Sequence, residues 1–134
     1  MTTYVLDTNT CVYWLKGKEE ILSKVTQVGV SDLATTIITL AELKYGAYHS
    51  RNVKENLESI DRFLRKVKVL PLVEEAVDTF GRIKADLRRA GKMIDDFDIL
   101  IGATTMAKDG ILVTNNTDHF RRIRGLRYEN WFEE

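Results

Sequence analysis

Short runs of β-type apolar residues alternate with longer helical segments along the whole of this chain. The runs lie at residues 4–6, 34–37, 67–70 and 111–113, and residues 126–131 predict an edge strand. Between them, apolar residues recur at helical spacing and the connections are short. Strands that alternate with helices in this way pack as an α/β fold with a mainly parallel sheet. We therefore predict one central sheet with helices packed against it.

Length and composition predict one domain with one core. Of the 134 residues, 44% are apolar and 30% are charged, and no linker or repeat divides them. No apolar run approaches the roughly 18 residues that span a membrane, and the first residues lack the pattern of a secretion signal. The single cysteine, Cys11, excludes an internal disulfide, and with two distant histidines it gives no zinc-binding spacing. Together these features predict a cytoplasmic protein.

The charges balance, because lysine and arginine number 20 and aspartate and glutamate also number 20. A protein that simply coats nucleic acid is basic overall, so a nucleic-acid role here depends on local patches. Arg88 and Lys92 precede an acidic stretch, and Arg121 and Arg122 follow another acid. These four cations are candidates for holding an RNA or DNA backbone. Each one alone is more simply explained as a solvated side chain or as the partner of a nearby acid.

Acidic side chains stand where strands give way to helices. Asp7 ends the first run, Glu42 lies in the helix after the second, and Asp118 follows the run at 111–113. Asp96 and Asp98 open a largely apolar helix. Because the functional crevice of a parallel sheet lies beyond the carboxyl ends of its strands, we predict that these acids meet there.

Each of these acids also has a purely structural explanation. Asp7 and the acids near residue 96 suit helix N-termini, where backbone N–H groups favour negative charge. Thr39 and Glu42 have the spacing of a capping box, with Thr39 as the N-cap. A shared role is favoured because several acids are expected at the same edge of the sheet.

A cluster of carboxylates needs a cation, because like charges a few ångströms apart repel and would otherwise take up protons. A set of oxygen ligands without His or Cys favours Mg²⁺ or Mn²⁺. The chemistry best suited to such a set is hydrolysis of a phosphodiester bond. The chain contains no glycine-rich loop for nucleotide phosphates.

Five motifs resemble those of the PIN-domain ribonucleases, and closely those of the VapC toxins of VapBC toxin–antitoxin systems. They lie at residues 5–9, 39–43 with Gly46, 98–103, 112–116 and 125–131. Each motif is weak alone, but their order and spacing cover nearly the whole chain. The resemblance implies that residues 1–134 form a single three-layer α/β/α PIN-like domain. It also implies a toxin that needs Mg²⁺ or Mn²⁺, cuts RNA with tRNA as the favoured substrate, and so inhibits translation.

The resemblance assigns roles to particular residues. It implies Asp7, Glu42 and Asp98 as the core catalytic acids, with Asp7 and Asp98 as metal ligands and Glu42 holding a metal or its water. Asp96 matches an acid that is present in some relatives, and it would assist the core acids. Three further residues of the matching motifs would support the site: Thr8, Asn9 and Thr114.

The fourth ligand position departs from the family pattern. Many PIN domains have aspartate two residues after the threonine of the loop, where this chain has Asn116. Either Asn116 serves as a neutral ligand, or Asp118 supplies the missing carboxylate.

The family further implies a homodimer and a cognate VapB-like antitoxin that places a basic side chain among the acids. An arginine there would replace the charge of the metal and bind the carboxylates through paired hydrogen bonds. Two alternatives remain open from the sequence. One is a PIN nuclease outside toxin–antitoxin systems, which would act in RNA processing or on DNA flaps. The other is a non-catalytic RNA-binding module that keeps the fold.

Overall fold

The computed structural model describes residues 2–132 and confirms the predicted alternation of strands and helices. In chain order the elements are β1 (Tyr4–Leu6), α1 (Thr8–Leu15), α2 (Glu19–Val28), the 3₁₀ turn η1 (Val30–Asp32), β2 (Leu33–Thr36), α3 (Ile37–Tyr48), α4 (Val53–Leu64), β3 (Lys68–Leu70), α5 (Glu74–Ala90), α6 (Asp96–Ala107), β4 (Ile111–Val113), α7 (Thr117–Phe120) and β5 (Tyr128–Glu129).

The sheet has the strand order β3-β2-β1-β4-β5, and every pairing in it is parallel. β1 lies at the centre, with Tyr4 opposite Leu33 of β2 on one side and Ile111 of β4 on the other. From β1 the order runs one way through β2 and β3 and the other way through β4 and β5. In such sheets the connections diverge at the reversal point and open a crevice at the strands' carboxyl ends.

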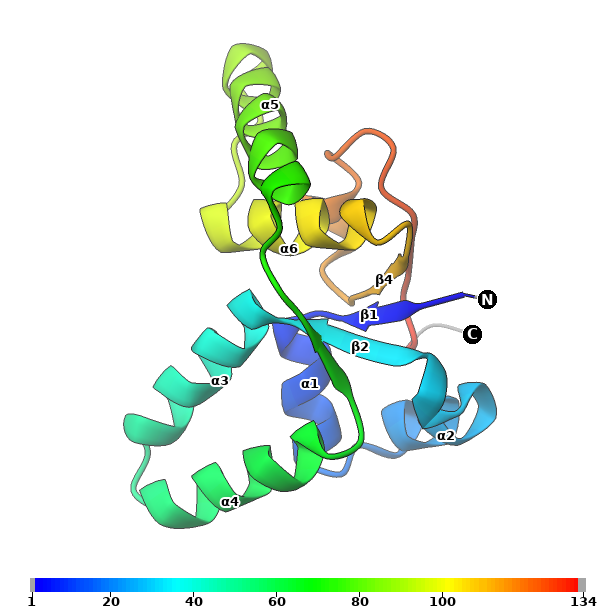
Figure 1. Cartoon of the computed structure of the whole chain (residues 1–134), viewed down its shortest axis with the longest axis vertical. Helices are drawn as coiled ribbons and strands as arrows, with labels where there is room; N and C mark the ends of the chain where they lie inside the picture. Colours follow the sequence, from blue (N-terminus) through cyan, green and yellow to red (C-terminus); the bar gives the residue numbers. More distant parts are fainter. Residues whose placement is uncertain (1, 133–134) are drawn as a thin grey trace.

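Helices cover both faces of this sheet, as the three-layer prediction requires (Figure 1). Successive residues of a strand point to opposite faces, so Leu6 packs on one side of β1 and Val5 on the other. Leu6 belongs to a core built with α1, α2, α3 and α4, whereas Val5 belongs to a core built with α5, α6 and α7. Both residues have 0% exposure.

The start of α3 differs from the sequence-based prediction. The N-cap is Thr36, whose side chain accepts a hydrogen bond from the N–H of Thr39 at 3.0 Å. The expectation that Thr39 caps the helix and pairs with Glu42 in a capping box is therefore wrong. β2 passes directly into the helix at Ile37, so Glu42 lies in the second turn and its carboxylate has no capping role.

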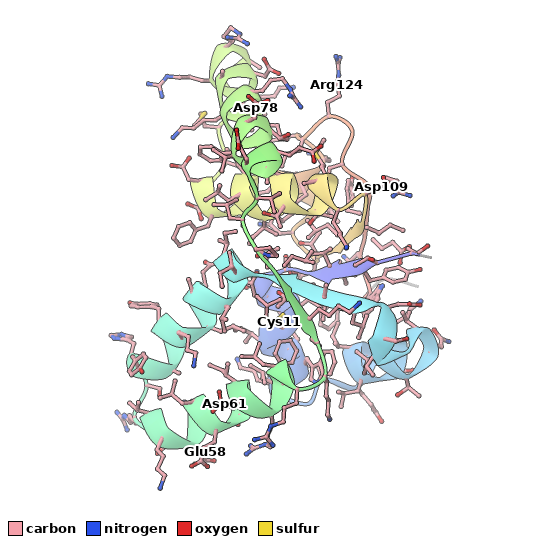
Figure 2. All side chains as sticks on the ribbon, viewed as in Figure 1. Cys11, Glu58, Asp61, Asp78, Asp109 and Arg124 are labelled. Carbon is pink, nitrogen blue, oxygen red and sulfur yellow. The ribbon has the colours of Figure 1, made fainter. Side chains whose placement is uncertain are left out.

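The charged side chains of Glu58 and Asp61 on α4 lie on the outside of the molecule (Figure 2), while Cys11 lies inside between α1 and the sheet. Burial raises the pKa of the Cys11 thiol well above its ordinary value, so this cysteine is an inert core residue. Within residues 2–132, no helix combines the length and the apolar character needed to cross a membrane.

Candidate active site

Asp7 lies at the carboxyl end of the central strand, between β1 and α1. Its side chain caps α1 by accepting a hydrogen bond from the N–H of Thr10 at 2.9 Å, and its own N–H donates to the carbonyl of Val113 at 3.0 Å. The residue is only 4% exposed. The capping interpretation of Asp7 is thus correct. It does not account for the burial of an ionisable group beside other acids.

Glu42 reaches the same place from α3. The hydroxyl of Thr8, in the first turn of α1, donates to Glu42 Oε1 at 2.5 Å. The hydroxyls of Thr8 and Thr39 lie 3.1 Å apart, which ties the first turns of α1 and α3 together. Glu42 is therefore held by its hydrogen bond to α1 as well as by its own helix.

Asp98 comes from the first turn of α6. The N-cap of that helix is Asp95, which makes no side-chain capping hydrogen bond. Asp98 Oδ2 instead lies 3.0 Å from Nδ1 of His119 in α7. The interpretation of this acidic stretch as helix capping therefore does not explain the position of Asp98.

The electrostatics show that these acids share one environment. Burial raises the pKa of Asp7, hydrogen bonds from Thr114 and Thr10 oppose the rise, and the charge of Asp98 adds to it. Burial also raises the pKa of Glu42, with the Thr8 hydroxyl opposing the rise and the charges of Asp98, Asp95 and Asp7 adding to it. Within the described chain, no lysine or arginine forms an ion pair with Asp7, Glu42 or Asp98.

Such a set of carboxylates fits Mg²⁺ or Mn²⁺ by its donor chemistry, since it offers oxygen ligands whose mutual repulsion a divalent cation relieves. The side chains are not already closed around a point. Across residues 2–132, no three His, Cys, Asp or Glu side chains are grouped so as to hold an ion.

Two acids that the sequence analysis assigned to this site pair with cations instead. Asp96 lies 2.9 Å from Lys84 Nζ on α5. Asp118 lies 2.6 Å from Arg121 and is more than half exposed. Neither acid is among the charges that raise the pKa of Asp7 or Glu42. The structure therefore does not bring Asp96 and Asp118 into the cluster.

The loop after β4 supplies other groups. Thr114 is buried, hydrogen-bonds Asp7 and accepts the N–H of Asn116 at 2.9 Å. The amide of Asn116 lies 2.9 Å from His119 Nδ1. Of the two candidates for the fourth position, Asn116 contacts His119, which in turn contacts Asp98, whereas Asp118 pairs with Arg121. Asn9, the remaining supporting candidate, is exposed in the first turn of α1.

His119 is the site residue that the sequence analysis missed. The available signal was its place three residues after Asn116, since residues three apart share a helix face. Nothing in the sequence alone indicated that this short helix would face Asp98.

A basic groove lies between α5 and the segment after α7. It has a volume of about 550 Å³, and the charged residues that line it are Arg82, Asp86, Lys92, Arg122 and Arg124. Arg122 Nη1 donates to the carbonyl of Met93 at 3.2 Å, which fixes this cation beside the segment that leads into α6. The other two cationic candidates, Arg88 and Arg121, are exposed and do not line the groove.

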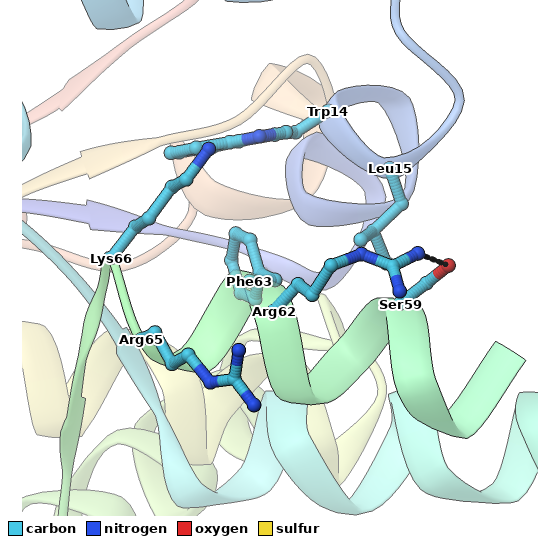
Figure 3. Close-up of a pocket in the computed structure, with 7 residues that line it drawn as sticks. All are labelled: Trp14, Leu15, Ser59, Arg62, Phe63, Arg65 and Lys66. Atoms are coloured by element: carbon cyan, nitrogen blue, oxygen red, sulfur yellow. Dashed lines mark hydrogen bonds between the residues drawn. The ribbon is translucent and has the colours of Figure 1, made fainter.

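A second groove runs away from the acids between α1, α3 and α4. It has a volume of about 340 Å³ and extends from Thr8 and Glu42 to Ser59 and Leu15. At that end it adjoins a pocket of about 410 Å³, shown in Figure 3, where Arg62, Arg65 and Lys66 surround an aromatic pair. The pair is Trp14 and Phe63, packed edge to face with ring centroids 5.0 Å apart. Glu42 thus lies at one end of a partly apolar trough that Lys16 also lines, and Arg62, Arg65 and Lys66 lie at the other end.

The sequence matches the PIN domain family over residues 4–126. The chain belongs to the PIN-domain family. It is also similar along nearly its whole length to curated VapC proteins. It is 39% identical to Ribonuclease VapC2 of Haemophilus influenzae over 98% of this chain and 99% of the relative. It is 34% identical to the tRNA(fMet)-specific endonuclease VapC of Shigella flexneri, with the same coverage of each chain. The predicted family is therefore confirmed, and this PIN domain groups with the VapC ribonucleases.

Solved structures agree with this grouping. The PIN domain superposes with a TM-score of 0.92 on a chain of DNA-bound VapBC from Salmonella typhimurium, with 35% identity and coverage of 98% of this chain and 99% of the other. It also superposes with a TM-score of 0.91 on a chain of VapBC2 from Rickettsia felis bound to a promoter DNA fragment, with 31% identity and coverage of 97% and 99%.

Proposed function

We propose that this PIN domain is a Mg²⁺- or Mn²⁺-dependent endoribonuclease toxin that hydrolyses phosphodiester bonds in tRNA and thereby inhibits translation. The observation that carries the proposal is the meeting of Asp7, Glu42 and Asp98, from three separate elements, at the carboxyl end of the central strand. The resemblance to a tRNA-specific VapC supports the choice of substrate. We further propose that residues 1–134 form a single PIN domain that acts in the cytoplasm, where tRNA is found.

The chain's own residues divide the work of the reaction. Asp7, Asp98 and Asn116 would hold the metal, and Glu42 would bind and orient a water molecule. When bound, the ion lowers the pKa of a water and polarises the phosphoryl group. Thr8 keeps Glu42 in place through its hydroxyl. Water attack in line with the leaving oxygen would yield a 5′-phosphate and a 3′-hydroxyl.

We propose that the RNA backbone follows the basic groove beside α5. Lys92 and Arg122 line this groove, and Arg122 is fixed next to the segment that leads to Asp98. Arg88 and Arg121 would contact phosphates beyond its edges. Such contacts position a nucleic acid without reading its sequence.

We also propose a VapB-like antitoxin as partner, as in the VapBC complexes that this chain resembles, and a homodimer as the assembly. The trough between α1, α3 and α4 supports the antitoxin proposal because its ends differ in charge. A segment with a basic residue at the Glu42 end and an acidic residue near Arg62 and Arg65 would complement it.

The test is cleavage of bulk tRNA by purified protein in Mg²⁺, in EDTA and with the Asp7→Asn variant. We expect cleavage only for the wild-type protein in Mg²⁺. Asp61→Asn is the matched control, because this aspartate lies exposed on α4 (Figure 2). Cleavage that survives both EDTA and Asp7→Asn would refute the mechanism, and metal-dependent RNA binding without cleavage would favour the binding-module alternative.

A further inference from the structure

His119 contacts the acid cluster from the loop that follows β4. Its Nδ1 lies 3.0 Å from Asp98 Oδ2 and 2.9 Å from the side-chain amide of Asn116. The imidazole is 38% exposed and the Asp98 side chain 22%. The contact is therefore partly shielded from water, which strengthens a hydrogen bond to a charged group.

The backbone at His119 is held in place by the packing of the residues that follow it. The next residue, Phe120, has 0% exposure and packs in the core shared by α5 and α6. Three residues further on, Ile123 lies so close to α6 that a Cβ added at Gly102 would be 2.9 Å from its Cδ1. The glycine of the α6 motif thus lets the segment around α7 pack directly on the helix that carries Asp98.

A continuous series of contacts joins the two acids among the proposed ligands, Asp7 and Asp98, through this loop. Asp7 is hydrogen-bonded by Thr114, whose hydroxyl accepts the N–H of Asn116 at 2.9 Å. The Asn116 side chain contacts His119, and His119 contacts Asp98. One loop of six residues therefore links the acid that follows β1 to an acid of α6.

The chemistry of the groups decides where the proton on the imidazole lies. A neutral imidazole carries one N–H, and an ionised carboxylate can only accept hydrogen bonds. Since Nδ1 faces Asp98 Oδ2 at 3.0 Å, the proton belongs on Nδ1. The Asn116 atom that lies 2.9 Å from Nδ1 is the amide nitrogen Nδ2, and two donors cannot bond each other. This tautomer therefore requires the amide to rotate by 180° and to present its oxygen to the ring. The opposite tautomer would place two lone pairs against each other unless Asp98 were protonated.

We propose that His119 is a positioning residue that donates from Nδ1 to Asp98 and holds this carboxylate beside Asp7 and Glu42 before a metal binds. This inference rests on the proposed metal-dependent nuclease function. Without such a bond, repulsion from Asp7 and Glu42 would turn the Asp98 side chain away. With it, Oδ2 is occupied and the other oxygen is left for the cation. Groups that fix metal ligands in this way typically contribute 10- to 100-fold to metal affinity.

The first measurement is the tautomer of His119 in the metal-free protein, from imidazole ¹⁵N NMR at pH 8.5. The chain has two histidines, so two ring patterns are expected, and His119→Leu identifies the relevant one. We expect the Nδ1–H form. A ring protonated only at Nε2 would overturn the proposal.

The second measurement is the Kd for Mn²⁺, by calorimetry and by loss of the free-ion EPR signal. We expect His119→Leu to weaken binding by about 10- to 100-fold. His119→Asn, whose amide N–H stands near the former Nδ1, should recover most of this loss, and His119→Gln should not. His49→Asn is the control, because His49 is exposed and stacks on Tyr45 away from the acids.

Wild-type affinity in His119→Leu, or equal losses in the Asn and Leu variants, would overturn the positioning role. These results differ from a failure of the nuclease proposal, in which the wild-type protein itself would bind no Mn²⁺ and cut no RNA. In that case the NMR measurement would still decide whether His119 holds Asp98.

Discussion

The substitution Asp7→Asn should stabilise the folded protein while it abolishes cleavage. Asp7 is almost fully buried, and burial raises its pKa above the ordinary value of 3.8. The folded state therefore disfavours the charge that the residue carries at neutral pH. Asparagine removes this charge and keeps an oxygen that can accept the N–H of Thr10.

The expected gain follows from opposing contributions. Removing the charge relieves the cost of keeping it buried, which is the largest cause of the raised pKa, and also the smaller repulsion from Asp98, together roughly 3–4 kcal/mol. The hydrogen bonds from Thr10 and Thr114 each weaken by about 1 kcal/mol when their acceptor becomes neutral. The free energy of unfolding should therefore rise by about 1–2 kcal/mol, which corresponds to a Tm increase of roughly 4–8 °C for a chain of this size.

The pH dependence provides an internal check. Because the folded-state pKa of Asp7 is raised, the folded protein binds more protons than the unfolded chain between pH 3.8 and that raised value. Wild-type stability should fall as pH rises through this window, whereas the variant lacks this contribution. The difference in Tm between the two proteins should therefore vanish below about pH 4 and be complete above the raised pKa.

The assay is thermal unfolding followed by circular dichroism, in EDTA and then with Mg²⁺, beside Asp61→Asn. At 100 times its Kd, a metal that binds only the folded wild-type protein adds about 2.7 kcal/mol and should reverse the order. A lower Tm for Asp7→Asn than for wild type in EDTA at pH 7.5 would refute the reasoning, since the buried charge would then be stabilising.

Three further substitutions test other parts of the structure. Thr8→Val removes the hydrogen bond that lowers the pKa of Glu42. The acidic limb of the cleavage pH profile should therefore move to higher pH, and activity at pH 6 should fall by about 10-fold. An unchanged profile would contradict the role of Thr8. Phe120→Ala should lower the free energy of unfolding in urea by about 3–5 kcal/mol, because Phe120 has 0% exposure. The control Phe97→Ala, at a residue with 45% exposure, should change the free energy of unfolding by less than about 0.5 kcal/mol. Lys92→Ala should weaken tRNA binding and lower the slope of log K against log salt by about 0.7–1; a change in affinity without a change in slope would show that Lys92 contacts no phosphate.

The sequence was sufficient to predict the fold class because the pattern that indicates it occurs many times along the chain. Apolar runs alternate with helical patterns many times, so misplacing one boundary leaves the α/β class unchanged. The error at α3 shows the limit of local patterns. Thr36 and Thr39 are both suitable caps, and the choice between them depends on where β2 ends against β1 and β3, which local spacing does not encode.

The site was less predictable because it depends on side-chain direction. Asp7 and Asp98 follow from their places at a strand end and a helix start. Asp118 also lies in a segment that follows a strand, β4, but its side chain points outward to Arg121. His119 lies one residue further and turns inward to Asp98. Sequence spacing alone cannot distinguish Asp118 from His119. The directions of their side chains are set by Phe120, the last residue of α7, which packs in the core.

The central position of β1 also determines when the acids can meet during synthesis. Asp7 emerges from the ribosome first, but β1 pairs with β4, whose Ile111 lies opposite Tyr4. Asp98 and the loop at 114–119 are likewise made late. Because non-local parallel pairing is slow to form and chains are built from the N-terminus, the cluster cannot assemble until most of the polypeptide is complete. A growing chain would therefore lack the assembled acid cluster until late in synthesis, and a partner would have that closing stage in which to reach it.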